Sequence, residues 1–303
     1  MKRLRLAALA LLCGAGPGCH AAALRFCDQA AQPSAAQLDR LLRFGDVIKS
    51  ELDRSGAQMA IVARSGLDLS RFGQRHSHAG FSLRNSPNAP WSVRQLYYAC
   101  DEGRPRLFDQ GMAGFLLGTS DPSIGYVSAL LLPAAQDKHV ERQVQDNAMA
   151  LQLLGGSYSA NAFPFDPRHQ NCNQWVIEML ASAWLPPPAP GDADPAPRVR
   201  AQHWLRDQGY APTRIEVRPL PLMWLGAFIP WVHGDDHPAE DLARQSYRVS
   251  LPASIEAFVR RQVPGTIRME FCHDEHRVVI RHGWTPIAEG CVPDEHDRVV
   301  LLD

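Results

Sequence analysis

The hydrophobic pattern in the first half of the chain predicts one amphipathic helix followed by short buried strands. Apolar residues recur at helical spacing through residues 34–55, and Gly56 follows them, which predicts a helix over this range. Residues 59–63 form a short apolar run rich in β-branched side chains, which predicts a buried strand. Residues 78–83 and 91–98 are separated by a turn-forming stretch, and we expect them to form two further strands of a meander.

In the middle of the chain the pattern changes from strand to helix. Residues 126–132 predict another strand, and residues 136–154 predict a single helix that ends at Gly155. Helical spacing returns in residues 173–184. Cys172 is therefore expected at the start of a helix.

A proline-rich segment divides the chain. Residues 186–197 carry six prolines, which neither a helix interior nor a central strand accommodates, so they predict a linker or long surface loop. The later pattern predicts helices and strands at residues 198–208, 214–218, 252–262, 266–272 and 277–281.

The predicted fold class is α+β. We expect a core over residues 24–185, in which an antiparallel sheet packs against the helix that begins at Cys172. An α+β extension over residues 198–303 follows the linker at 186–197.

The amino-terminal residues 1–23 have the pattern of a secretory signal sequence. Basic residues precede an apolar run at 6–12, and three alanines at 21–23 come before the expected cleavage site at Leu24. The apolar run is much shorter than the roughly 20 residues of a membrane-spanning helix. We therefore expect a periplasmic or secreted protein, soluble after cleavage.

Composition excludes several functional classes. The chain has 31 basic and 32 acidic residues without a basic stripe, so we expect no nucleic-acid partner. The hydrophobic fraction of 45% indicates a globular protein rather than a disordered one. No cofactor motif is present, and no cofactor is predicted.

Removal of the signal sequence leaves an odd number of cysteines. The five are Cys27, Cys100, Cys172, Cys272 and Cys291. In an oxidising compartment, an odd number suggests one thiol outside the disulfides. The simplest pairing joins Cys272 to Cys291 and Cys27 to Cys100, which leaves Cys172 as the thiol. The alternative is several buried cysteines that form no disulfide.

Cys172 and His78 are the residues whose positions suggest chemistry. A cysteine at a helix start has its thiolate stabilised by the helix dipole, and a histidine at the edge of a strand can supply the base. Small Ala79 and Gly80 would let a facing helix and a substrate approach the strand. The alternative is that both residues are structural. His76 is expected at the surface, because the strand begins after it.

The segments around these two residues resemble a known enzyme superfamily. Ser77-His78-Ala79-Gly80-Phe81 and Asn171-Cys172-Asn173-Gln174-Trp175 are similar to the histidine and cysteine motifs of the circularly permuted NlpC-type branch of the papain-like superfamily. In that branch, which includes lecithin:retinol acyltransferase-like proteins, histidine precedes cysteine. More widely, nearly the whole mature chain, including Ala63-Arg64-Ser65-Gly66 and Arg281-His282-Gly283-Trp284, resembles a family of exported bacterial proteins, domain of unknown function family 2145.

This resemblance implies that the core over residues 24–185 has a permuted papain-like fold, and it implies roles for particular residues. It makes Cys172 the nucleophile and His78 the base, and it requires a polar residue on the next strand to orient the imidazole. Gln95 is the candidate, with an ordinary solvent-facing glutamine as the alternative. The motif neighbours expected to contact substrate are Ser77, Gly80, Asn171 and Asn173.

The predicted function is an exported cysteine hydrolase or acyltransferase that attacks an amide or ester bond of a cell-wall peptide or lipid-type substrate through an acyl-enzyme. A peripheral contact of the protein with the cell wall or the membrane is compatible with this function. The alternative is a noncatalytic periplasmic binding or assembly protein with the same fold.

Two other segments invite different functions. His233–His237 and His273–His276 contain metal-ligand residue types, but without a recognised ligand spacing we expect solvated turns and predict no metal site. Metal-dependent hydrolysis through these histidines is a third hypothesis. The apolar residues 224–231 are expected in the core, with an acyl-binding groove or a membrane contact as alternatives.

Overall fold

The computed structural model describes residues 33–186, 196–218, 223 and 229–302. The predicted signal sequence, Cys27 and residues 187–195 of the predicted linker lie outside these ranges.

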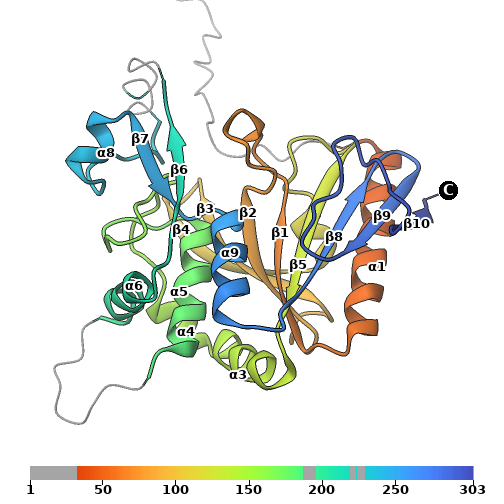
Figure 1. Ribbon diagram of the computed structural model, residues 1–303, viewed down its shortest axis with the longest axis horizontal. Coiled ribbons are helices and arrows are strands. Elements are labelled where there is room, and N and C mark those ends of the chain that lie inside the picture. The colour runs from red at the N-terminus through yellow and green to blue at the C-terminus, as the bar shows by residue number, and fades with distance from the viewer. Residues whose placement is uncertain (1–32, 187–195, 219–222, 224–228, 303) are drawn as a thin grey trace, which may run out of the picture.

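One antiparallel sheet of eight strands forms the centre of the described part of the chain (Figure 1). Its strand order is β10-β9-β8-β5-β1-β2-β3-β4. The bounds are β1 Met59–Arg64, β2 His78–Leu83, β3 Ser92–Ala99, β4 Arg104–Gln110, β5 Gly125–Leu131, β8 Ile267–His273, β9 Arg277–His282 and β10 Arg298–Leu301. A separate two-stranded sheet pairs β6 (Thr213–Glu216) with β7 (Ser246–Val249). The large sheet and its helices give the α+β class expected from the sequence.

Helices cover both faces of the large sheet (Figure 1). On one face lie α1 (Ala35–Ser55) and the short α2 (Met112–Leu116). The other face carries α3 (Ala134–Gln145), α4 (Asn147–Gln152), α5 (Cys172–Trp184), α6 (Pro197–Asp207) and α9 (Pro252–Gln262). A 3₁₀ turn at Ser70–Phe72 lies between β1 and β2, and α8 (Ala239–Ala243) packs beside β7.

The sheet is buried on both faces because its strands carry apolar residues at successive positions. In β1, Ile61 packs into the core that contains α5, while its neighbour Val62 packs into the core that contains α1. Side chains alternate along a strand, so a continuous apolar run supplies both cores. The predicted buried strand at 59–63 is confirmed.

The first helix has clear local signals at both ends. Ser34 and Gln37 form a capping box at its amino terminus, and Gly56 takes a left-handed conformation (φ 75°) at its end. These residues explain why the predicted helix over 34–55 agrees closely with α1.

The single helix predicted over 136–154 is wrong. The structure divides this segment into α3 and α4 at Asp146, whose backbone is extended and whose carboxylate accepts hydrogen bonds from the N–H groups of Ala148 and Met149. The aspartate caps a new helix instead of continuing the old one, and the apolar pattern does not reveal this.

The segment after the proline-rich stretch joins the same sheet. β8 pairs with β5 along its whole length, and Phe271 lies opposite Val127. On the helical face, α6 and α9 pack against α5. Strands β8, β9 and β10 of the carboxy-terminal extension therefore continue the sheet that carries β1 and β2, whereas β6 and β7 form the separate two-stranded sheet.

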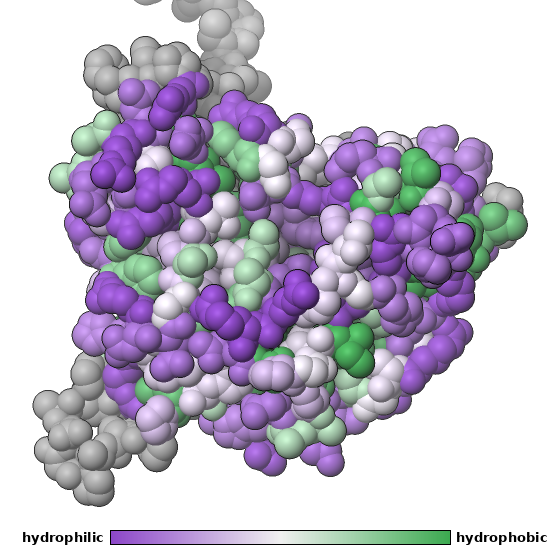
Figure 2. Space-filling view, in the orientation of Figure 1, coloured by the Kyte–Doolittle hydropathy of each residue, from purple (hydrophilic) through white to green (hydrophobic). Residues whose placement is uncertain are grey.

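No helix among the described residues is long and apolar enough to cross a membrane. Figure 2 shows one face of the molecule, on which hydrophilic side chains predominate and apolar ones form small separate patches.

Candidate active-site cleft

Cys172 is the first residue of a deeply buried helix. The side chain of Asn171 caps α5 by accepting a hydrogen bond of 2.7 Å from the N–H of Gln174. Cys172 keeps its thiol and is 7% exposed. The predicted position of the cysteine at a helix start is confirmed, and the partial positive charge of a helix amino terminus favours an anion there.

Cys172 and His78 line one cleft of about 460 Å³. Ser77, Asn171 and Asn173, three of the residues expected to contact substrate, also line it. The rest of its wall is largely apolar and includes Leu96, Tyr98, Ile229, Trp231, Val249 and Leu251.

A direct contact joins the start of the cysteine helix to the start of the histidine strand. The side-chain amide of Asn173 donates a hydrogen bond of 3.0 Å to the carbonyl of Ser77. Because Asn173 follows Cys172 and Ser77 precedes His78, this bond fixes the two segments side by side.

His78 and Gln95 are brought together from adjacent strands. Nε2 of His78 lies 2.8 Å from Oε1 of Gln95, and Gln95 is fully buried. The amide nitrogen of Gln95 in turn donates to Oε1 of Gln110 on β4, at 2.7 Å. The alternative of a solvent-facing Gln95 is therefore wrong. Gln110 was not identified from the sequence, because β4 was not predicted.

The surroundings of His78 keep its imidazole neutral. Burial, and then the positive charge of Arg64, lower the pKa of His78 to about 3, while the hydrogen bond with Gln95 acts in the opposite direction. Arg64 is the cross-strand partner of His78 in the β1–β2 pair. The imidazole is thus in its base form across the physiological pH range.

Hydrogen bonds hold Arg64 beside this histidine, one of them to the carbonyl of Ser65 at 3.1 Å. Its guanidinium donates to the hydroxyl of Tyr97 at 2.5 Å and to the carbonyl of Gly118. The Tyr97 ring stacks on the His78 imidazole with centroids 4.6 Å apart. Arg64 and Tyr97 both line the cleft, and sequence reasoning assigned neither to the site.

The family of the chain follows from a model that covers most of its length. The model described as "Uncharacterized protein conserved in bacteria (DUF2145)" matches residues 51–259, more than half of the 303-residue chain. The chain belongs to the DUF2145 family. No curated protein and no solved structure matches it significantly. The resemblance to the permuted NlpC-type branch therefore stays a prediction.

The DUF2145 match contains every residue of the predicted catalytic group, namely His78, Gln95 and Cys172. It also continues across residues 186–197, so the predicted linker lies inside the region that defines the family.

Gly80 does not have the surroundings expected of a substrate contact. A Cβ at this position would lie 2.7 Å from Cγ1 of Val93, 2.9 Å from the carbonyl oxygen of Arg94 and 3.1 Å from Cβ of Gln95. In this DUF2145 protein the glycine permits close approach of β3, which carries Gln95, rather than of a facing helix.

His76 is buried, so the expectation that it lies at the surface is wrong. It lies beside a network of charged side chains, with Nε2 3.9 Å from Oε1 of Glu270. Burial lowers the pKa of His76. Its neighbours include Glu270 and Arg268 on β8 and Glu256 on α9, far along the chain, and no local pattern predicts that packing.

The carboxy-terminal cysteines of the DUF2145 protein form the expected pair. Cys272 and Cys291 are joined in a disulfide, which is compatible with export. Cys100 is also disulfide-bonded, and Cys27, its predicted partner, lies outside the described residues.

The two histidine-containing segments are not simple solvated turns. Asp236 and His237 are buried, and both have hydrogen-bond partners in the loop before α5. Asp236 accepts a hydrogen bond from the N–H of Phe163, and Nε2 of His237 lies 2.7 Å from the carbonyl oxygen of Asn161. In the second segment, His273 ends β8 and is 1% exposed. The expectation of solvated turns therefore holds for Asp235, Glu275 and His276, which are exposed, and is wrong for Asp236, His237 and His273, which tertiary contacts bury.

Of the apolar segment 224–231, Ile229 and Trp231 line the cleft. Trp224, Leu225 and Phe228 lie outside the described residues.

Proposed function

We propose that this protein is an exported thiol hydrolase or acyltransferase that attacks an amide or ester carbonyl through Cys172. The observation that carries the proposal is the shared cleft, in which Cys172 begins a helix and His78 is oriented by Gln95. A nucleophile, a base and an orienting group are the parts of papain-type catalysis. The resemblance of the two motifs to the permuted NlpC-type branch supports the same assignment.

The proposed reaction follows from these groups. The thiol proton passes to Nδ1 of His78, because Nε2 is engaged with Gln95, and the sulfur adds to the substrate carbonyl carbon. The tetrahedral adduct expels an alcohol or amine, which takes the proton from His78, and leaves a thioester on Cys172. Water or a second acceptor attacks this thioester and restores the thiol.

The cleft wall favours a substrate with an apolar portion. Trp231, Ile229 and Leu251 line the same cleft as the cysteine with apolar side chains. Burial of such surface contributes about 25 cal/mol per Å² to binding. A lipid-type acyl group and an apolar peptide side chain are the two chemistries that fit, and both occur at a bacterial cell envelope.

A noncatalytic binding or assembly protein with the same fold is the second candidate. It is favoured by the pKa of His78, which burial and Arg64 lower to about 3. Such an imidazole is a weak acceptor for the proton of a thiol, whose ordinary pKa is about 8.5. Under this alternative the cleft binds its ligand without turnover.

Alkylation with iodoacetamide and mapping of the adduct by mass spectrometry test the thiol. We expect modification at Cys172, slower modification in His78→Gln, and none in Cys172→Ser. A Cys172 found in a disulfide, or an adduct only elsewhere, would refute the proposal.

Release of 4-nitrophenol from its acetyl and octanoyl esters separates the two candidates. The enzyme predicts a burst equal to the protein concentration, followed by turnover that Cys172→Ser abolishes. An alkylated Cys172 without any burst on either ester would favour the binding protein.

A further inference from the structure

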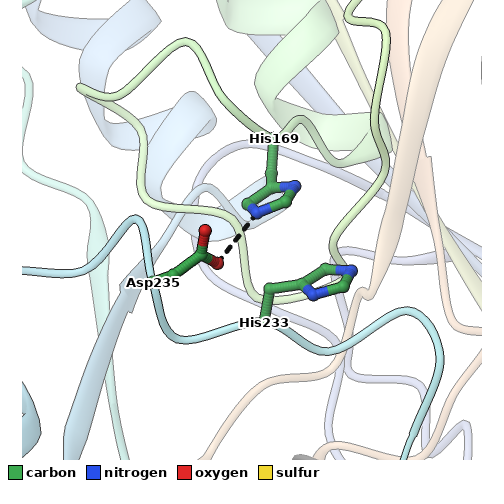
Figure 3. Close-up of side chains that lie close together, drawn as sticks. All are labelled: His169, His233 and Asp235. Atoms are coloured by element: carbon green, nitrogen blue, oxygen red, sulfur yellow. Dashed lines mark hydrogen bonds and ion pairs between the residues drawn. The ribbon is translucent and has the colours of Figure 1, made fainter.

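Three side chains of metal-ligand type meet at one edge of the cleft wall. They are His169, His233 and Asp235, and their ligand atoms all lie within 4.8 Å of one another (Figure 3). His169 comes from the loop before α5, whereas the other two come from a segment more than 60 residues later. The cluster is therefore a product of the fold and has no local sequence motif.

His169 is oriented as a metal-binding histidine normally is. Its Nδ1 lies 2.9 Å from the hydroxyl of Ser157, and its Nε2 lies 3.0 Å from a carboxylate oxygen of Asp235. The Asp235 carboxylate can only accept, so Nε2–H donates to it; a bound ion would take the place of this proton, and Nδ1–H would then donate to the hydroxyl of Ser157. A contact of this kind on the second ring nitrogen fixes the tautomer in most metal sites.

His233 supplies a second imidazole next to the first. Its ring lies parallel to that of His169, with centroids 4.4 Å apart (Figure 3). Its backbone is held, because its N–H bonds to the hydroxyl of Ser159 and its carbonyl accepts from the amide of Asn161. One ion cannot lie in the planes of two parallel rings, so binding requires the half-buried His233 side chain to turn out of the stack.

Asp235 supplies the negative charge and has room to adjust. Its side chain is 59% exposed, and it is also 3.5 Å from Arg168. Arg168 keeps a closer partner, Asp166, at 2.8 Å. An ion at Asp235 therefore replaces the contact between Asp235 and His169 and the long ion pair with Arg168, and it leaves the shorter pair of Arg168 with Asp166 in place.

We propose that His169, His233 and Asp235 bind a divalent transition-metal ion of the zinc class. Two imidazoles and one carboxylate are ligands that zinc accepts, whereas calcium and magnesium prefer oxygen ligands alone. Water completes the tetrahedron at the fourth position.

The position of the site indicates a structural role. His169 precedes Cys172 by three residues, and Trp231 and Val232, directly before His233, line the cleft. A hydrogen bond of 2.7 Å already joins the N–H of Ala160 to the carbonyl of Trp231. The ion would fasten this wall of the cleft to the loop that leads into the cysteine helix, whether or not the thiol is catalytic.

Calorimetric titration of the chelator-treated protein with zinc chloride tests the proposal. We expect one ion per chain in the wild type and in Cys172→Ser, and no binding in His169→Ala or His233→Ala. Ser157→Ala should weaken binding about 10-fold or more, since it removes the partner that orients His169. His203→Ala, an exposed histidine on α6, is the matched control and should bind as the wild type does.

Two further measurements keep the result decisive if a histidine variant is unstable. Asp235→Asn replaces an exposed side chain, so it should fold normally and still bind zinc at least about 10-fold more weakly. Cobalt(II) should give the absorption of a tetrahedral site without thiolate charge transfer. Absence of zinc binding in the wild type, zinc affinity unchanged from the wild type in both folded histidine variants and in Asp235→Asn, or binding lost in Cys172→Ser would each overturn the proposal.

Discussion

The amide oxygen of Gln95 lies 2.8 Å from Nε2 of His78, and both side chains are buried. The amide nitrogen of Gln95 donates to Gln110, so the oxygen is the end that faces the imidazole. Nε2 of His78 therefore carries the proton, and Nδ1 is the acceptor. The cross-strand pairing of β3 with β4 thus determines which nitrogen of a histidine on β2 is available as a base.

Replacement of Gln95 by methionine removes this hydrogen bond while keeping a side chain of similar length. We expect alkylation of Cys172 to slow at least about 10-fold, a part of the roughly 10²–10⁴-fold that a positioned base contributes. Rates measured with iodoacetamide across a range of pH check the prediction. Gln110→Ala, which removes only the outer partner, should have a smaller effect.

Gln95→Glu separates an orienting role from a purely structural one. A carboxylate beside the imidazole favours its protonated form, so the pKa of His78 should rise from about 3 towards its ordinary value. The pH profile of alkylation should shift with it. Identical profiles for the wild type and Gln95→Glu would contradict the orienting role.

The low pKa of His78 also predicts how stability depends on pH. The unfolded chain binds a proton at this histidine near pH 6.5, whereas the folded protein binds it only near pH 3. The contribution of His78 to the unfolding free energy is therefore constant above about pH 6.5. As the pH falls from 6.5 towards 3, this contribution destabilises the fold progressively. By pH 4 this amounts to about 3 kcal/mol.

Urea denaturation of the wild type and His78→Gln at pH 7.5 and pH 4 measures this effect. The difference in unfolding free energy, wild type minus variant, should fall by about 3 kcal/mol between the two pH values. His276→Gln, at an exposed position, is the control and should leave the pH dependence unchanged. A difference that stays constant with pH would show that His78 titrates normally.

Elements with strong local signals were predictable from the sequence, and edge strands were not. α1 has a capping box at Ser34 and a left-handed glycine at Gly56, and β1 is a continuous apolar run. β4 and β10 lie at the two edges of the sheet and are largely exposed. Because few side chains of these two strands are buried, their sequences lack the apolar run that marks an interior strand.

The residues of the candidate site also divide into those that local sequence features predict and those that only the tertiary structure places. Cys172 and His78 were predictable because a helix start and a strand edge are local features. Gln110, Arg64 and Tyr97 act on His78 through the register of neighbouring strands, which the order of residues along the chain does not reveal. The cluster of His169 and Asp235 depends likewise on contacts between distant segments.

Gly80→Ala tests the close approach of β2 and β3. The added Cβ would lie 2.7 Å from Val93, 2.9 Å from Arg94 and 3.1 Å from Gln95, so β3 would have to move away. We therefore expect the unfolding free energy to fall by about 1–3 kcal/mol. The displaced β3 should also slow alkylation of Cys172 by moving Gln95. Gly156→Ala is the matched control, because nothing lies within 4 Å of a Cβ there. Equal stability of the two variants would refute the packing role of Gly80.

A buried ion pair holds the cysteine helix against α6. Glu178 on α5 is fully buried and lies 2.9 Å from Arg198, whose side chain is 8% exposed. Glu178 also accepts from Gln170, whose own amide oxygen accepts from the N–H of Gly155. The carboxylate thereby fixes both the helix and the loop that leads into Cys172.

Glu178→Leu leaves the charge of Arg198 buried without compensation, so we expect unfolding free energy to fall by about 3–5 kcal/mol. The double variant with Arg198→Leu should lose much less, because no unpaired charge remains and leucine fills part of the space. Guanidinium denaturation of both single variants and the double variant completes a double-mutant cycle. If the losses of unfolding free energy in the two single variants add up to the loss in the double variant, the two residues are not coupled. The single variant should also alkylate Cys172 at an altered rate, because Gln170 loses a partner in the loop before the helix.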